Sequence, residues 1–370
     1  MIKTKHIHID LKEPYRCIVI SDIHSHLDRL QELLKKVNYQ LDDYLIINGD
    51  FVEKGTQGIE TIAFLRQLQQ TSDRVYILLG NCEYALETLV SNPRFAREML
   101  HYFRKIGKSG LIEQAIHALH IDLQQEAPAL IQRQVNDYLH SSLEFIRNLP
   151  TTIETDQFLF VHAGIEKRVD WKNSQLSSFI EMRNFQQTGH LLDRYVIVGH
   201  LPTSNFYQRY INNDIIIDDE KKIISIDGGT GVKMISQLNA LVIEGHHGQY
   251  TMHQEYVQPL PKYQVISDVR QQSEPVYKIA WPHFQVEVIA YGDEFSLCRQ
   301  MDTHLVFDIK NEFLYERQGH IYCLDDYTNH KLSLKQGEVV ELIGIYGRYA
   351  YVRFHQEIGW IKAHLIKKYF

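Results

Sequence analysis

Residues 17–37 read CIVISDIHSHLDRLQELLKKV, an apolar run followed by a short polar stretch and then by a helical pattern. The apolar run CIVIS (17–21) has the length and the β-branched content of a buried strand. The later apolar residues recur at helical spacing and form one stripe: Leu27, Leu30, Leu33, Leu34 and Val37. A buried strand that leads into an amphipathic helix is the repeating unit of α/β proteins, so this stretch predicts an α/β core covered by helices.

The same alternation continues along a first domain, which we place at residues 1–258. Residues 84–148 are instead almost wholly helical in pattern, and Pro150 closes that stretch. We therefore predict a helical cap insertion at residues 84–150. Further strands are expected at YLIIN (44–48), VYILL (75–79), FLFVHAG (158–164), YVIVGH (195–200), IISIDGG (223–229) and LNALVIEG (238–245).

The C-terminal part of the chain has short β-rich runs and an internal repeat. VEVIAYGDEFSLCR (286–299) aligns with VELIGIYGRYAYVR (340–353) at an offset of 54 residues. Two small all-β barrel modules would explain this repeat, and we place them at residues 259–330 and 331–370. The second module resembles the bacterial Src-homology-three-like domain, which implies binding of a peptide or protein partner. Packing of the modules against the first domain is an equally open alternative.

Composition and charge exclude several classes of function. The net charge of -7 gives no basic field, so we expect no duplex nucleic acid as a partner. No apolar run approaches the roughly 20 residues that a bilayer requires, and the start is polar, so we expect neither a membrane partner nor a signal peptide. The four cysteines lack CxxC spacing, which is typical of reduced thiols and predicts a cytoplasmic location.

Polar residues directly follow the predicted strands of the first domain. Ligand sites of open α/β folds form outside the carboxyl ends of strands, so we expect these side chains to meet. Imidazole, carboxylate and amide ligands suit divalent cations, and Asp50 could bridge two of them. Two cations about 3.5–4 Å apart would clamp a phosphoryl group. The predicted metal ligands are Asp22, His24, Asp50, Asn81, His162 and His200.

The order of these motifs resembles that of the calcineurin-like metallophosphoesterases, in particular their phosphoprotein phosphatase branch. That branch includes serine/threonine phosphatases and symmetrical diadenosine tetraphosphate hydrolases. The resemblance covers roughly residues 15–247 and implies a metallophosphoesterase β-sandwich flanked by helices. The motifs that carry it are DIHSHL (22–27), GDFVEKG (49–55), GNCE (80–83), FVHAGI (160–165) and VGHLP (198–202).

The resemblance also implies how the site is divided and what it does. One cation would be held by Asp22, His24 and Asp50, and the other by Asp50, Asn81, His162 and His200. Manganese is the expected metal, with iron, zinc or magnesium as alternatives. A hydroxide between the two cations would hydrolyse a phosphate ester or anhydride.

Two residues are expected to bind the phosphate. Arg183 in FIEMRNF (179–185) matches the family's phosphate-contacting arginine, and a guanidinium suits bidentate phosphate capture. The alternative for Arg183 is an ordinary surface residue. Lys54 stands where the family has an arginine, so a point charge replaces a planar fork.

Other departures from the family pattern concern the proton donor. Ser25 and Leu201 replace a glycine and a threonine, Glu53 replaces an aspartate, and Cys82 replaces the histidine that protonates the leaving oxygen. A thiol with an ordinary pKa of about 8.5 is a poor substitute for an imidazolium. General acid catalysis contributes typically ~10²–10⁴-fold, so its loss should matter least when the leaving group is itself a phosphate. The catalytic candidates are Glu53, Lys54, Cys82 and Arg183.

These residues favour a metal-dependent phosphohydrolase similar to serine/threonine protein phosphatases, with a phosphoprotein or nucleotide as the phosphorylated substrate. The alternative within the same class is a diadenosine-tetraphosphatase-like nucleotide hydrolase or a phosphodiesterase. A third alternative, from another class, is a non-catalytic scaffold with this fold that binds partners through its C-terminal barrels.

Overall fold

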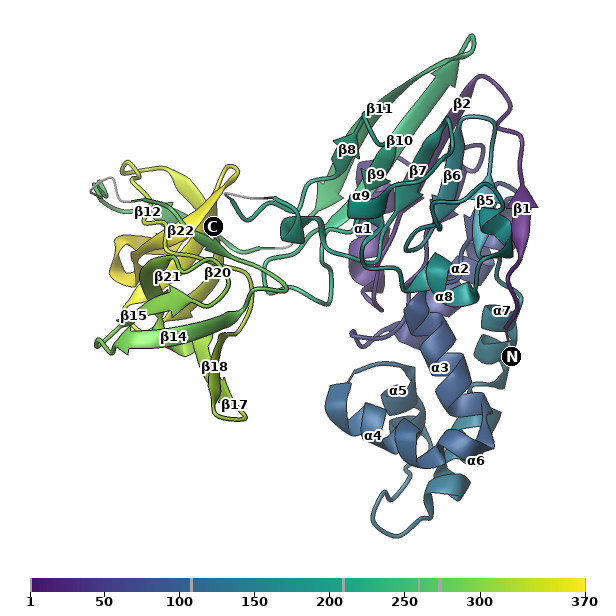
Figure 1. Cartoon of the computed structure of the whole chain (residues 1–370), viewed down its shortest axis with the longest axis horizontal. Coiled ribbons are helices and arrows are strands. Elements are labelled where there is room, and N and C mark those ends of the chain that lie inside the picture. Colours follow the sequence, from purple (N-terminus) through teal and green to yellow (C-terminus); the bar gives the residue numbers. More distant parts are fainter. Residues whose placement is uncertain (1, 107–108, 208–209, 259, 272–274, 370) are drawn as a thin grey trace. The chain divides into compact units, whose positions relative to one another are not determined.

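The structure is a computed structural model that describes residues 2–106, 109–207, 210–258, 260–271 and 275–369. It consists of two compact units (Figure 1). The N-terminal unit comprises Met1–Pro202, Asp214–Val232 and Gln237–Val257. The C-terminal unit comprises Thr203–Asn213, Lys233–Ser236 and Gln258–Phe370.

The first sheet of the N-terminal unit has the strand order β11-β10-β2-β3-β4. Strands β2, β3 and β4 are parallel, whereas β10 is antiparallel to both β2 and β11. Ile20 of β2 lies opposite Ile47 of β3, so the loops that follow these two strands leave the sheet at the same edge. The strands are β2 (Tyr15–Ile20), β3 (Tyr44–Ile47), β4 (Val75–Ile77), β10 (Leu238–His246) and β11 (Gln249–Val257).

The second sheet has the order β1-β5-β6-β7-β9-β8. Its central strands β6, β7 and β9 are parallel, with Phe160 opposite Ile197. The strands are β1 (His6–His8), β5 (Thr152–Glu154), β6 (Phe158–Val161), β7 (Tyr195–Val198), β8 (Ile216–Asp218) and β9 (Ile223–Ser225).

The two sheets pack face to face because alternate residues of their strands are apolar on both faces. Cys17 and Val19 of β2 join Phe160 and Ile197 in the core between the sheets. Ile18, on the opposite face of β2, packs instead in the core that holds the helices. This arrangement confirms the predicted α/β class and its β-sandwich flanked by helices.

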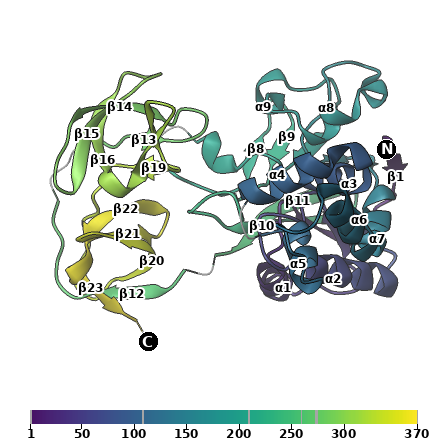
Figure 2. The same cartoon turned by 90° about the horizontal axis from the view of Figure 1, so that it is seen from below.

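Helices cover the outer faces of both sheets. On the first sheet lie α1 (Leu27–Lys36) and α2 (Gly58–Thr71). Leu30 and Leu33 of α1 pack in the core between the helices and this sheet. On the second sheet lie α8 (Leu176–Ile180) and α9 (Phe185–Thr188). A helical segment follows β4, in the range predicted for the insertion. Its helices are α3 (Asn81–Ser91), α4 (Ala96–Ile106), α5 (Leu111–Ala118), α6 (Pro128–Tyr138) and α7 (His140–Arg147), and α3, α4 and α6 pack on one another (Figure 2).

The C-terminal unit is all-β. One sheet has the order β22-β21-β20-β12-β23, a second has the order β16-β15-β14-β18-β17, and β13 pairs with β19. The strands of the first sheet are β12 (Lys262–Val265), β20 (Val339–Tyr346), β21 (Tyr349–Phe354), β22 (Glu357–Lys362) and β23 (Ile366–Lys368). The others are β13 (Lys278–Ile279), β14 (Gln285–Ala290), β15 (Phe295–Gln300), β16 (Val306–Lys310), β17 (Leu314–Arg317), β18 (His320–Cys323) and β19 (Tyr327–Thr328).

The internal repeat of the sequence recurs as a repeat of structure. Strands β14 and β15 form an antiparallel pair whose register shifts between Val288 and Ala290. Strands β20 and β21 form the same kind of pair, with the shift between Leu342 and Gly344. The two irregularities fall at equivalent positions of the aligned segments, which indicates one hairpin design used twice. The likeness of these sheets to Src-homology-three-like barrels stays a prediction.

Two features of the C-terminal unit differ from the sequence analysis. Strand β12 lies in the range given to the first module, 259–330, but pairs with β20 and β23, which lie in the range of the second. Residues 203–213 and 233–236, placed in the first domain, belong to this unit. There, Ser204 Oγ donates to Asp326 Oδ2 (2.6 Å) and Lys233 Nζ donates to Asp326 Oδ1 (2.6 Å). The exact module boundaries and the cytoplasmic location stay predictions.

Among the described residues, every helix is too short or too polar to cross a bilayer.

Asn48, directly after β3, joins the two sheets of the sandwich. Its fully buried side chain donates from Nδ2 to the carbonyl oxygens of Val161 (3.0 Å) and Ile197 (3.2 Å) in the second sheet. Its own carbonyl oxygen accepts from Ser21 Oγ (3.1 Å) and from His162 Nδ1 (2.9 Å). This one residue therefore holds the carboxyl-terminal ends of strands from both sheets together.

We predict that Asn48→Leu lowers the free energy of unfolding by about 2–4 kcal/mol. Leucine has a similar size, but it leaves two buried carbonyl groups without a donor, and each such group costs about 1–3 kcal/mol. Urea unfolding measures the loss. Asn148→Leu is the matched control, because Asn148 is exposed and its replacement should change stability by no more than about 0.5 kcal/mol. Equal stabilities of the two variants would contradict this role of Asn48.

Candidate metal centre

The structure brings all six predicted metal ligands to one place at the carboxyl-terminal edges of both sheets. Asp22 and His24 follow β2, Asp50 follows β3 and Asn81 begins α3 after β4, whereas His162 follows β6 and His200 follows β7.

Several of these six residues hold backbone conformations that most residues avoid. Asp22 (φ 54°), His24 (φ 48°), Asp50 (φ 50°) and His200 (φ 69°) are all left-handed. Such strain clusters at functional sites, where the surrounding structure enforces it.

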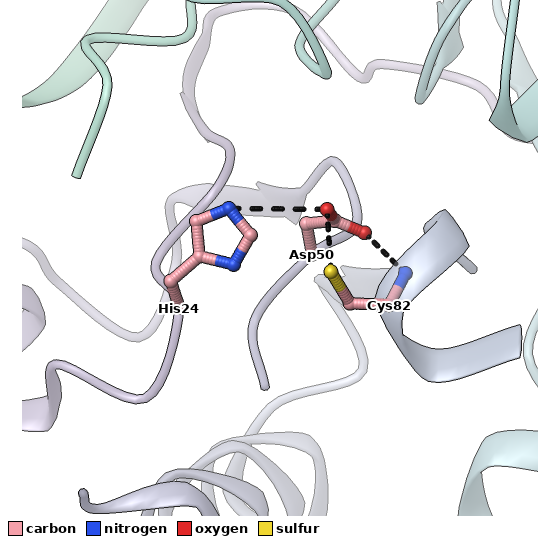
Figure 3. Close-up of side chains that lie close together, drawn as sticks. All are labelled: His24, Asp50 and Cys82. Carbon is pink, nitrogen blue, oxygen red and sulfur yellow. Dashed lines mark hydrogen bonds and ion pairs between the residues drawn. The ribbon is translucent and has the colours of Figure 1, made fainter. Parts of the chain in front are cut away.

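Asp50 lies at the middle of the group, as Figure 3 shows for part of it. Its Oδ1 lies 3.4 Å from His162 Nε2, and its Oδ2 lies 3.8 Å from His24 Nε2. His24 Nε2 is also 3.7 Å from Asp22 Oδ1. Two overlapping groups of side chains are close enough to hold an ion: Asp22, Asp50 and His162, and His24, Asp50 and Cys82. Their common member is the residue expected to bridge two cations.

Hydrogen bonds fix the imidazoles in the orientation that a metal ligand needs. His162 Nδ1 lies 2.9 Å from the carbonyl oxygen of Asn48, and His24 Nδ1 lies 3.3 Å from that of Val52. A carbonyl can only accept, so each Nδ1 carries the proton and each Nε2 presents a lone pair to the site. Outer hydrogen bonds of this kind set the tautomer and orientation of metal-binding histidines.

The amide of Asn81 is the clearest sign that a cation fits here. Its Oδ1 lies 3.0 Å from His162 Nε2 and 2.8 Å from His200 Nδ1. Without an ion the amide would gain hydrogen bonds by turning its NH₂ group towards the two rings. Asp22 Oδ1 is likewise buried without a hydrogen-bond partner among the described residues. A positive ion would satisfy the amide oxygen, the ring nitrogens and this carboxylate oxygen together.

The electrostatics of the site determine the protonation state of each candidate ligand. Burial and the neighbouring Asp50 raise the pKa of Asp22 to about 8. Burial also acts to raise the pKa of Asp50, but the nearby His162 and His24 outweigh it and lower that pKa. Burial lowers the pKa of His24 and of His200 to about 3, so both rings are neutral near pH 7. Neutral imidazoles are the form in which histidines bind metals, whereas Asp22, whose raised pKa favours the protonated form at pH 7, would lose a proton when an ion binds.

Glu53 faces the helical insertion. Its Oε1 accepts from the backbone N–H of Leu111 (2.9 Å) and its Oε2 accepts from the hydroxyl of Tyr102 (3.1 Å). Burial raises its pKa to about 7. Within the described residues no hydrogen bond joins Glu53 to Cys82, whose thiol donates to Asp50 Oδ2 (3.0 Å). Glu53 and Cys82 are therefore each held by other partners in this structure.

The two expected phosphate-binding residues differ in their surroundings. Lys54 is exposed overall, but its Nζ reaches into the site and donates to His24 Nε2 (3.2 Å). Burial acts to lower the pKa of Lys54, but Cys82, Asp50 and other acidic neighbours raise it, so the amine stays charged. Arg183 lies on the exposed loop between α8 and α9, and its positive charge contributes to the lowered pKa of His200 after burial and His162.

Sequence analysis missed Glu83, the last residue of the GNCE motif. Its fully buried carboxylate accepts from four backbone N–H groups at 2.9–3.0 Å: Asp50, Phe51, Val52 and Gly80. Glu83 thus ties the loop after β3 to the start of α3. The signal was its place in the GNCE motif already quoted, three residues after Gly80.

The family comparison covers most of the chain. The model of the calcineurin-like phosphoesterases matches residues 15–294, further than the motif resemblance that ends near residue 247. The chain belongs to this family.

Curated relatives include enzymes of two kinds. A symmetrical bis(5'-nucleosyl)-tetraphosphatase of Vibrio parahaemolyticus serotype O3:K6 is 25% identical over 158 residues, which are 42% of this chain and 47% of that protein. Serine/threonine-protein phosphatase 7 of Arabidopsis thaliana is 35% identical over 105 residues, 28% of this chain and 25% of the relative. The chain thus spans about half or less of the length of these relatives.

Among solved structures, a protein serine/threonine phosphatase of Saccharomyces cerevisiae is 11% identical with a TM-score of 0.40, covering 68% of this chain and 82% of that one.

Gly199, directly before His200, gives a test of the site geometry. A Cβ at this position would lie 2.0 Å from Ser21 Oγ and 2.2 Å from Asp22 Oδ2. We predict that Gly199→Ala displaces the Asp22 carboxylate and weakens Mn²⁺ binding about 10–100-fold, the usual cost of disturbing the support of a ligand. Titration calorimetry measures the affinity.

Gly189→Ala is the control, because nothing lies within 4 Å of its added Cβ although its backbone is left-handed (φ 66°). Unchanged Mn²⁺ affinity in Gly199→Ala would show that Asp22 is not a ligand.

Proposed function

We propose that the protein is a metal-dependent phosphohydrolase of the kind represented by serine/threonine phosphatases, acting on phosphate esters or anhydrides with two divalent cations. One observation carries the proposal: oxygen and nitrogen atoms of Asp22, His24, Asp50, Asn81, His162 and His200 converge at one place, where a buried oxygen of Asp22 has no hydrogen-bond partner among the described residues. Manganese is the first ion to test, since carboxylate and amide oxygens suit it and the imidazoles tolerate it. A cytoplasmic location is part of the same proposal.

The ligand atoms would hold the cations between the two sheets. Asp50 belongs to both candidate groups and would bridge, while Asp22 and His24 approach from one sheet and His162 and His200 from the other. Once bound, a pair of divalent cations supplies Lewis-acid polarisation of a phosphoryl group and a water nucleophile ionised at neutral pH.

The remaining residues would grip the phosphate. Lys54 holds its ammonium within the site, 3.2 Å from His24 Nε2, and would turn this charge to a phosphoryl oxygen. Arg183 is exposed at the site's edge and can offer two parallel N–H donors to the same group. Together they would neutralise the charge that the transferring group carries.

The leaving group separates the two substrate classes. Glu53 is engaged by Leu111 and Tyr102, and the thiol of Cys82 points to Asp50, so neither side chain is aimed at a departing alkoxide. A phosphate leaving group needs no proton donor, which favours nucleotide anhydrides. The tetraphosphatase among the relatives is consistent with this second candidate.

We predict that the Mn²⁺ form hydrolyses diadenosine tetraphosphate with a higher kcat/KM than a phosphoserine peptide or an aryl phosphate diester. The physical reason is the weak proton donor, whose loss costs typically ~10²–10⁴-fold for a strongly basic leaving group. Steady-state assays of the three substrates at equal metal concentration decide the order. Faster turnover of the phosphopeptide would overturn the leaving-group argument and leave the protein phosphatase as the better proposal.

We further predict that Arg183→Ala lowers kcat/KM about 10–100-fold without changing metal content. The size follows from the loss of charge-assisted hydrogen bonds worth about 1.5–3 kcal/mol. Arg133→Ala, on a side chain that is 81% exposed on α6, is the matched control and should behave like the wild type. If Arg183→Ala retains full activity, Arg183 is a surface residue and Lys54 alone binds the phosphate.

The scaffold alternative makes the opposite prediction for metal content. A purified protein with less than one equivalent of divalent metal and no hydrolysis of any of the three substrates would favour a binding protein. The peptide or protein partner proposed for the C-terminal sheets would then be its main ligand.

A further inference from the structure

Cys82 occupies the first turn of α3, next to the predicted ligand Asn81. Its side chain is 4% exposed, and its Sγ lies 3.0 Å from Asp50 Oδ2. The same Asp50 oxygen is 3.8 Å from His24 Nε2. Figure 3 shows the thiol, on the first turn of α3, and the imidazole, on the loop after β2, directed at this one oxygen. A sulfur, an oxygen and a nitrogen atom from three segments of the chain therefore converge.

The spacing of the three atoms suits a metal ion. They all lie within 4.8 Å of one another. Ligand atoms held about 2.0–2.3 Å from one tetrahedral ion are about 3.3–3.7 Å apart, so the two measured distances lie just below and just above that range. The present contact is a thiol hydrogen bond, and an ion in place of the thiol proton would lengthen it by about half an ångström.

The backbone also supports this position. Cys82 N donates to Asp50 Oδ1 (2.8 Å), so the residue holds the bridging carboxylate by its main chain while its side chain reaches the other oxygen. The carboxylate of Glu83, the next residue, accepts hydrogen bonds from four backbone N–H groups and so fixes the loop that carries Asp50. The sulfur is thus held in place by structure that does not depend on the thiol itself.

We propose that Cys82 is a ligand of one of the two cations and forms a sulfur-containing position with His24 and Asp50. The inference rests on the proposed function, because it takes a two-cation site as given. The thiol loses its proton to solvent when the ion binds, and Lys54 gives up its hydrogen bond to His24 Nε2. Cys82 is then not the weakened proton donor expected from the sequence.

A thiolate changes which ion the site prefers. Sulfur ligands select softer ions such as zinc, whereas carboxylate and amide oxygens suit manganese and magnesium. The group of Asp22, Asp50 and His162 has no sulfur, so the two positions would differ in preference. We therefore expect zinc, iron or cobalt at the Cys82 position even when manganese fills the other.

Cobalt substitution tests the proposal without reference to activity. The metal-free full-length chain is titrated with Co²⁺, and the spectrum and the number of ions bound are measured. A cobalt–thiolate bond gives a sulfur-to-metal charge-transfer band in the near ultraviolet, which oxygen and nitrogen ligands do not give. We expect this band in the wild type, its loss in Cys82→Ser with cobalt still bound, and its retention in Cys323→Ser, whose thiol lies in the C-terminal unit and donates to the Asp325 carbonyl oxygen.

The outcomes separate this inference from the proposed function. A wild type that binds two Co²⁺ ions without the band, or a band that persists in Cys82→Ser, overturns the ligand role of Cys82 and leaves the metal site standing. Absence of cobalt binding overturns both. X-ray absorption of the zinc-loaded wild type decides the matter even if Cys82→Ser fails to fold, because a sulfur neighbour at about 2.3 Å is distinct from nitrogen or oxygen at about 2.0–2.2 Å.

Discussion

The hydrogen bonds that Asn48 makes from one sheet to the other are the contacts on which the site depends. The side chain of Asn48 donates to carbonyl groups of Val161 and Ile197, and its own carbonyl oxygen accepts from His162. Asp50 follows two residues later on the same strand end. The six candidate ligands come from two sheets whose shared core is mostly apolar, and apolar packing alone tolerates sliding. Directional hydrogen bonds between the strand ends remove that freedom and keep the imidazoles opposite the carboxylates.

The site concentrates features that oppose folding. Left-handed backbone at residues other than glycine costs of order 1–3 kcal/mol each, and two buried carboxylates repel each other. The compensation is local: Glu83 binds the backbone N–H groups of the loop that carries Asp50, and Lys54 adds a positive charge. The remaining deficit of positive charge is what a pair of cations would supply. Metal binding would therefore also stabilise the folded protein.

Local pattern predicted the α/β core and the gathering of the six candidate ligands, whereas the sandwich was implied by the family resemblance. Buried strands are recognisable from their apolar runs, and residues after parallel strands meet at one edge. The sequence could not predict contacts set by side-chain direction or by partners distant in the chain. The thiol of Cys82 turns to Asp50 and the carboxylate of Glu53 turns to Tyr102, and neither direction can be read from the motifs. For the same reason the pairing of β12 (Lys262–Val265) with β20 and β23 could not be predicted from the sequence.

The hydrogen bonds of Glu53 limit how this protein can diverge. Its buried carboxylate receives a hydroxyl from Tyr102 of α4 and a backbone N–H from Leu111 of α5, both within the helical insertion. Lys54 is the adjacent residue. The insertion therefore cannot be exchanged for an unrelated helical segment without loss of these hydrogen bonds. A replacement of different length or sequence would have to supply the same two donors, or evolution would have to change Glu53 in the same step.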